Sequence, residues 1–416
     1  MTCDIKDEND PYKINIQLED ERNYGRKLFF EKGLSALLAD PHFLLVYVPE
    51  NGDKMRIIRP ASDSEHRKRI IKMINGARDV PSFYYVLSHV WGLSENNRYL
   101  WHEIGDHVDD EDGKPVDPVS MRPEKRNTLL SMLKDYPGSY WWIDVLCART
   151  DTPLDIMGDI YACCLECVAM IDCEPTLIPQ LTSMMGVREH LFDSVYVPED
   201  DPFAKELYDV KLPKVRDALF TLMQCSWWTR VWTWQEMALP LGEVRLMAET
   251  GTHREPLANT ITLNGLFDKF RHVVTVMDNK GYRGANALRL WFSEIHSPIR
   301  YIEGAKGDTH SDFFYLLRTL GASTRRCMDP ADYVYGVLGI FQLKIPRMTD
   351  SGAVWQHFLT EFDKYMERMK NKEVGLEGTI IGISDRARKV NLLEAKDMSD
   401  VYNGFLEMLK VTPKSK

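Results

Sequence analysis

The apolar residues along the first 250 positions form two patterns, continuous runs and helical spacing, which together predict an α/β sheet. Runs of β-branched and aromatic residues over Phe83–Ser88, Tyr140–Leu146 and Val168–Ile171 are typical of strands buried on both faces. Between them, apolar residues recur at helical spacing over Arg122–Asp135 and Leu154–Cys167. Strands separated by helices imply a mostly parallel sheet wrapped by helices.

The pattern changes on either side of this unit. Upstream, we expect a helix over Glu21–Leu38, a strand over Phe43–Val48 and a helix over Glu65–Asn75. Downstream of residue 250 only helical periods remain, and they cover Leu263–Met277, Ala285–Ile299, Asp312–Leu320 and Val354–Lys370. We therefore predict an N-terminal extension (1–53), an α/β domain (54–250) and a helical C-terminal region (251–416).

Composition and charge narrow the class of protein. The chain has 416 residues, 44% of them hydrophobic, and a net charge of −10, which disfavours nucleic acid as a partner. It shows neither a signal peptide nor an apolar run near the ~20 residues that span a bilayer, so we expect a cytoplasmic protein without a membrane span. The cluster Cys163, Cys164, Cys167 and Cys173 lacks a second ligand pair, and we expect free thiols packed in a helix and no metal.

Four separated motifs carry a family resemblance. They are Leu87-Ser88-His89-Val90-Trp91-Gly92; Trp142-Ile143-Asp144-Val145-Leu146-Cys147 followed by Asp151; Trp227-Trp228-Thr229-Arg230-Val231-Trp232-Thr233-Trp234-Gln235-Glu236; and Asp329-Pro330-Ala331-Asp332-Tyr333-Val334-Tyr335-Gly336-Val337-Leu338-Gly339. Met157 and Ile160-Tyr161 also match the family pattern. In this order the motifs resemble those of the heterokaryon-incompatibility (HET) family. Two departures stand out: Ala148-Arg149-Thr150 replaces the usual Ile-Asn-Gln, and Ala331 replaces an arginine.

The resemblance implies a fungal effector of programmed cell death and innate immunity. The HET domain is itself similar to the TIR domain, which implies a flavodoxin-like sheet. In enzymatic TIR domains, a glutamate placed like Glu236 helps to cleave the nicotinamide–ribose bond of NAD. The resemblance thus implies hydrolysis of NAD or a related nucleotide, without a separate cofactor, and association of copies on activation.

The same resemblance, with the rule that ligands bind at the carboxyl ends of parallel strands, gives a candidate site. Glu236 is the candidate catalytic residue. The candidate substrate-binding residues follow the expected strand ends or precede Glu236; they are Ser88, His89, Trp91, Gly92, Asp144, Cys147, Arg149, Arg230 and Trp232. Ser88 and His89 point to opposite faces of one strand, so they cannot form a nucleophile–base pair.

Structural roles remain open for the same residues. Glu236 could pair with Arg230, and the tryptophans could be core residues. A buried Asp144 must have a partner, such as Arg230 or backbone N–H groups, because an unpaired buried carboxylate is costly. The alternative function is a non-enzymatic signalling module that works by self-assembly.

Overall fold

The computed structural model describes residues 12–17, 24–91, 93–94, 97–184, 202–251, 259–304, 310–372 and 383–409. Its centre is an eight-stranded sheet with the strand order β12-β11-β10-β3-β9-β1-β2-β7. The strands are β1 (Leu45–Tyr47), β2 (Met55–Ile58), β3 (Tyr84–His89), β7 (Val108–Asp109), β9 (Tyr140–Ile143), β10 (Glu166–Ile171), β11 (Glu243–Ala248) and β12 (Thr260–Thr262). Two small two-stranded sheets, β4 (Leu93–Ser94) with β5 (Asn97–Arg98) and β6 (Leu100–Trp101) with β8 (Val119–Ser120), lie outside it.

The four central strands, β11, β10, β3 and β9, are parallel to one another. Val86 of β3 pairs with Trp142 of β9 on one side and Cys167 of β10 on the other. Almost every residue of β3, β9 and β10 is buried, as expected for strands covered on both faces. The predicted α/β class is confirmed, and antiparallel β1, β2 and β12 extend the sheet at its edges.

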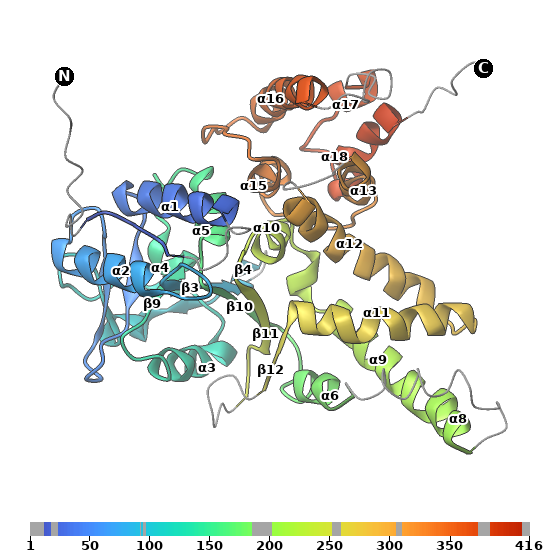
Figure 1. Ribbon diagram of the computed structural model, residues 1–416, viewed down its shortest axis with the longest axis horizontal. Coiled ribbons are helices and arrows are strands. Elements are labelled where there is room, and N and C mark those ends of the chain that lie inside the picture. The colour runs from blue at the N-terminus through green and yellow to red at the C-terminus, as the bar shows by residue number, and fades with distance from the viewer. Residues whose placement is uncertain are drawn as a thin grey trace.

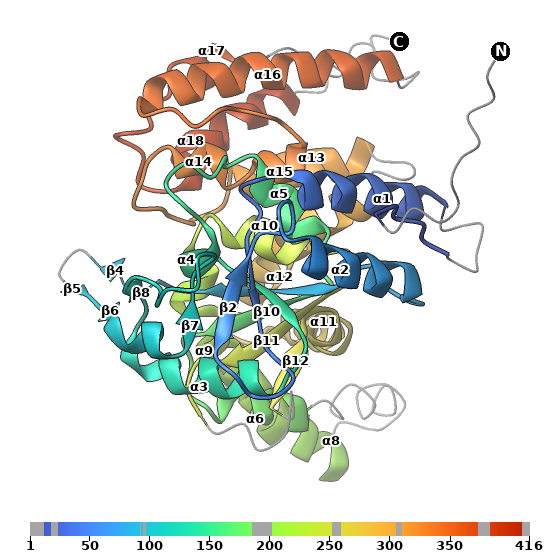
Figure 2. The ribbon, with the colours of Figure 1, turned by 90° about the vertical axis from the view of Figure 1, so that its left-hand side faces the viewer.

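Helices cover both faces of this sheet. Figures 1 and 2 show α1 (Tyr24–Ala39) and α5 (Ile156–Ala162) on one side and α3 (Pro123–Lys134) and α6 (Leu177–Ser183) on the other. Helix α2 (Ser64–Gly76) begins where the Asp63 carboxylate accepts from His66 N, and its predicted apolar face is buried. The chain continues through α8 (Pro202–Glu206), a π-helical turn (Leu207–Lys211), α9 (Leu212–Met223), a 3₁₀ turn (Ser226–Thr229) and α10 (Thr233–Ala238).

Two predicted elements were wrong at their ends. The strand predicted over Tyr140–Leu146 stops at Ile143, and Asp144–Cys147 forms the helical turn α4. The Asp144 carboxylate accepts from Val145 N (2.7 Å), which favours a turn over an extended chain. The helix predicted over Leu154–Cys167 stops at Ala162, and Cys167 lies in β10. The cysteine cluster is therefore not helical; the seven cysteines of the described ranges have free thiols.

The C-terminal helices pack on the sheet domain. They are α11 (Leu263–Asn279), α12 (Ala285–Gly304), α13 (His310–Leu320), α14 (Asp332–Tyr335), α15 (Leu338–Phe341), α16 (Ser351–Lys372), α17 (Asp385–Arg388) and α18 (Met398–Tyr402). Figures 1 and 2 show α13 to α18 gathered beyond α5 and α10, on the side of α1. The fourth motif takes part in this packing, because its apolar residues Tyr333, Val334, Val337 and Leu338 are at most 2% exposed.

Strands also cross the predicted domain limits. β1 lies before residue 53 and pairs with β9, and β12 lies after residue 250 and pairs with β11. The limits at 53 and 250 remain predictions. Within the described ranges, no helix has both the length and the apolar character needed to cross a bilayer.

The contact between α10 and the C-terminal region depends on a glutamine and two glycines. Gln235, 1% exposed, donates through Nε2 to Tyr335 O (2.8 Å) and accepts through Oε1 from Gly339 N (3.1 Å). A methyl group on Gly158 of α5 would lie 2.8 Å from Gly339 Cα. Backbone therefore meets backbone here, which requires the absence of side chains at both positions.

Replacing Gly339 with alanine tests this contact. The new methyl group would collide with Gly158 and with the Gln235 side chain, so we expect Gly339→Ala to lower the free energy of unfolding by about 1–3 kcal/mol. Urea denaturation measures the change. Gly76→Ala is the matched control, because a methyl group there meets no atom within 4 Å and should leave stability unchanged or slightly raised. Equal stability of Gly339→Ala and the parent would contradict the contact.

Candidate functional site

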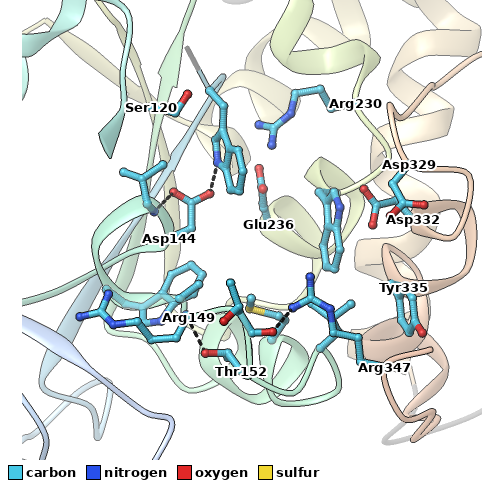
Figure 3. Close-up of a pocket in the computed structure, with 18 of the residues that line it drawn as sticks. Ser120, Asp144, Arg149, Thr152, Arg230, Glu236, Asp329, Asp332, Tyr335 and Arg347 are labelled. Atoms are coloured by element: carbon cyan, nitrogen blue, oxygen red, sulfur yellow. Dashed lines mark hydrogen bonds between the residues drawn. The ribbon is translucent and has the colours of Figure 1, made fainter. Parts of the chain in front are cut away.

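A cavity of about 500 Å³ opens where β3 and β9 end. One wall comes from the segments that follow these strands and from Arg230, Trp232 and Glu236. The opposite wall comes from the C-terminal region and consists of Asp329, Asp332, Tyr335, Arg347 and Met348. Figure 3 shows Glu236 near the centre, with Asp144 on one side and Asp329 and Asp332 on the other. The cavity is thus built by both parts of the chain.

Glu236 is a buried carboxylate with two hydroxyl donors. It lies on α10, is 3% exposed, and accepts from Ser88 Oγ and, at 3.5 Å, from Tyr161 OH. Ser88 in turn accepts from Trp227 Nε1 (2.7 Å), which directs the Ser88 hydroxyl hydrogen to Glu236. Burial raises the pKa of Glu236, although the charge of Arg230 and the bond from Ser88 oppose the shift.

Asp144 is a second carboxylate of the same cavity, with the opposite shift. It accepts from His89 Nε2 (3.0 Å), from Trp91 Nε1 and from Val145 N (2.7 Å). Burial alone would raise the pKa of Asp144, but the interactions with His89 and Trp91 outweigh it, so the pKa lies below its ordinary value. Asp144 therefore stays ionised under conditions that favour a proton on Glu236.

A buried lysine fixes the imidazole that supports Asp144. Lys125 of α3 is 0% exposed, and its Nζ donates to Val90 O and lies 2.8 Å from His89 Nδ1. An ammonium group can only donate and a carboxylate can only accept, so His89 accepts through Nδ1 and donates through Nε2. Burial lowers the pKa of Lys125 to about 7 and also lowers the pKa of His89. At pH values below about 7, where Lys125 is protonated, its ammonium group therefore holds the neutral His89 in one tautomer.

Arg230 does not pair with Glu236. Within the described residues it forms no ion pair with any carboxylate, and its Nη1 donates to His89 O (2.7 Å) instead. Its own carbonyl accepts from Arg325 Nη1 (3.1 Å), and Arg325 is buried in an ion pair with Glu294 of α12. The C-terminal region therefore fixes the backbone that carries Arg230.

The structure brings six of the ten predicted site residues to the cavity wall: Trp91, Asp144, Arg149, Arg230, Trp232 and Glu236. Ser88 and His89 are buried behind Glu236 and Asp144, on opposite sides of β3 as expected. Cys147 does not face the cavity; its thiol points back to Trp141 O, and burial raises its pKa to about 12. Gly92 lies outside the described residues.

Several cavity residues were missed from the sequence. Lys125 stands in a charged helical segment with no motif, so nothing marked it as buried. Asp329 and Asp332 belong to the fourth motif, which contributed to the family resemblance but to none of the candidate site residues. Arg347 has no local signal, although its Nη1 donates to Thr150 O in the segment that departs from the family pattern. Burial raises the pKa of Asp332 to about 6.

Comparison with known proteins gives one match. Residues 84–236 match the family model described as heterokaryon incompatibility protein (HET). No curated protein and no solved structure matches the chain. The matched segment runs from the start of β3 to Glu236, so it holds both buried carboxylates, and it supports a role in heterokaryon incompatibility and cell death. The match covers residues 84–236 and supports assignment of this segment to the HET family.

Proposed function

We propose that the protein hydrolyses NAD or a related nicotinamide dinucleotide at the nicotinamide–ribose bond. The observation that carries this proposal is the pair Asp144 and Glu236, two carboxylates in one cavity whose pKa values are shifted in opposite directions. Such a pair supplies one permanent negative charge and one group that can exchange a proton. The similarity of the HET domain to TIR domains is a second, weaker support.

The reaction needs both kinds of group. When the N-glycosidic bond breaks, its electron pair stays on the nicotinamide nitrogen, nicotinamide leaves as a neutral ring, and the ribose becomes oxocarbenium-like. The ionised Asp144 stabilises that positive charge. A water molecule then adds to the ribose carbon and loses a proton to Glu236, which gives nicotinamide, ADP-ribose and a proton.

Burial makes both carboxylates effective. Asp144 is held by three donors, so its orientation does not have to change during the reaction. Glu236 is surrounded by the aromatic side chains of Trp227 and Tyr161, whose polar atoms point toward it or toward Ser88. A charge in such a water-poor site acts more strongly than the same charge in bulk water.

The alternative is a signalling module that acts in the cytoplasm by association of copies, without catalysis. It predicts that cell toxicity is independent of the Glu236 carboxylate. The enzymatic proposal predicts that toxicity and nicotinamide release are lost together. Association of copies on activation is compatible with both functions, so turnover, rather than oligomeric state, separates them.

Glu236→Gln is the direct test of catalysis. We expect nicotinamide release from NAD, measured by chromatography, to fall on the order of 10²-fold or more, because the proton acceptor is lost. Burial raises the pKa of Glu236 above 4.5, so its contribution to stability is complete below that pH and is lost as pH rises through the raised pKa. Glutamine does not ionise, so the variant does not lose stability as pH rises through this pKa. The variant should therefore not melt below the parent at neutral pH.

The matched control is Glu65→Gln, which removes an exposed carboxylate on α2, remote from the cavity, and should change neither property. A Glu236→Gln variant that melts well below the parent, yet keeps full turnover and toxicity per folded molecule, would assign Glu236 to the scaffold.

Lys125→Met tests the support of Asp144. Without Lys125, the pKa of His89 should rise, because the lysine charge that lowers it is gone. An imidazolium would then neutralise Asp144 at a higher pH than in the parent. We expect the acid limb of the pH–rate profile to move to higher pH and kcat to fall by about 10-fold to 100-fold, which is typical of a lost orienting partner.

Lys134→Met is the control for Lys125→Met, because Lys134 is exposed at the end of the same helix. Melting curves of both variants separate loss of folding from loss of orientation. An unchanged kcat and acid limb in folded Lys125→Met would show that Lys125 does not position the site.

A further inference from the structure

A second cavity, of about 490 Å³, adjoins the first. The two share Trp91, Arg230, Trp232, Asp329 and Asp332, so they are compartments of one cleft. The second compartment is completed by Val90, Thr229, Val231, Arg326, Cys327 and Met328. Each volume lies within the range of about 300–1,000 Å³ that is usual for small-ligand pockets.

We propose that this second compartment binds the adenylate half of the dinucleotide, with the base against Trp91, Trp232 and Met328 and the phosphates at Arg230 and Arg326. This inference rests on the proposed function, since it assumes that the reacting ribose lies at Glu236 in the first compartment. It adds the place in the cleft where the non-reacting purine nucleotide half binds, which the proposed function leaves open.

The aromatic lining supports a flat, apolar ligand. Trp91 is 40% exposed and Met328 is 70% exposed, although both side chains are large and apolar. The Trp91 indole is held by its bond to Asp144, so a ligand would meet a fixed ring rather than a mobile one. A purine base can stack on such a ring without matching hydrogen-bond donors, because stacking depends on the face of the ring itself.

The cations support phosphate. Within the described residues, neither Arg230 nor Arg326 forms an ion pair with a carboxylate. The Arg326 side chain is exposed. Its backbone forms two hydrogen bonds with the segment that carries Arg230: Arg326 N donates to Thr229 O (2.7 Å), and Arg326 O accepts from Val231 N (3.1 Å). Guanidinium groups bind phosphate through two parallel hydrogen bonds. Arg230 lines both compartments, which is where a pyrophosphate bridge would have to pass.

The acidic residues of the shared wall suit the riboses. Asp329 and Asp332 line both compartments and can accept hydrogen bonds from sugar hydroxyl groups. The side chains of Trp232 and Asp332 form a hydrogen bond, which lowers the pKa of Asp332 and so opposes the effect of burial. Of the groups invoked here, Asp144 and Glu236 line only the first compartment, and Arg326 and Met328 line only the second. The groups common to both are Arg230, Trp91, Trp232 and the two aspartates.

A shorter substrate distinguishes the compartments. Nicotinamide riboside carries the reacting bond but lacks the phosphates and the adenylate half, so it needs only the first compartment. We expect Met328→Asp and Arg326→Ala each to raise the KM for NAD by about 10-fold or more and to leave kcat/KM for nicotinamide riboside unchanged. Met328 and Arg326 are exposed, so both variants should fold. Met73→Asp, at an exposed methionine on α2, is the matched control and should affect neither substrate.

Binding of AMP, measured by calorimetry, separates failure of this inference from failure of the proposed function. AMP should bind the parent and Glu236→Gln equally and should lose about 10-fold or more in affinity to Met328→Asp. That binding pattern without any dinucleotide hydrolysis would refute the proposed function and keep the purine site. Glu236-dependent NAD hydrolysis with an unchanged KM in Met328→Asp and Arg326→Ala, or with no AMP binding, would overturn the purine site alone.

Discussion

The burial of α10 between the sheet and the C-terminal helices is the constraint on which the structure depends. All six residues of this short helix are buried, and three of them, Thr233, Gln235 and Glu236, are polar. Buried polar groups need partners, and consecutive residues on a helix face different directions. Gln235 therefore bonds to the C-terminal region through Tyr335 and Gly339, whereas Glu236 bonds to β3 through Ser88.

This arrangement couples chemistry to tertiary packing. The far wall of the cavity comes from residues 329–348, which lie outside the segment matched by the family model. Arg325 and Glu294 form a buried ion pair that also holds the carbonyl of Arg230. A change in how the C-terminal helices pack would therefore shift the cation that faces both compartments.

Asp144 and Glu236, two carboxylates of the cavity, differ because their donors differ. Asp144 receives three hydrogen bonds and the support of Lys125 through His89, so its charge is stabilised in spite of burial. Glu236 receives only hydroxyl donors, and no cation contacts it directly within the described residues, so burial dominates. The environment of each group, rather than its residue type, sets its role in the proposed reaction.

The sequence by itself determined the elements whose signal is local. Continuous apolar runs identified β3 and β10, and helical spacing identified α2 and four of the C-terminal helices, α11, α12, α13 and α16. The motifs identified Glu236 and Asp144 as candidate site residues. It misplaced the end of β9 and the position of Cys167, because an apolar run does not reveal where an extended chain becomes a turn. Only the tertiary structure decided that Lys125 is buried against His89 and that Asp332 and Arg347 complete the cavity. These contacts join residues far apart in the chain, so no local period or spacing records them.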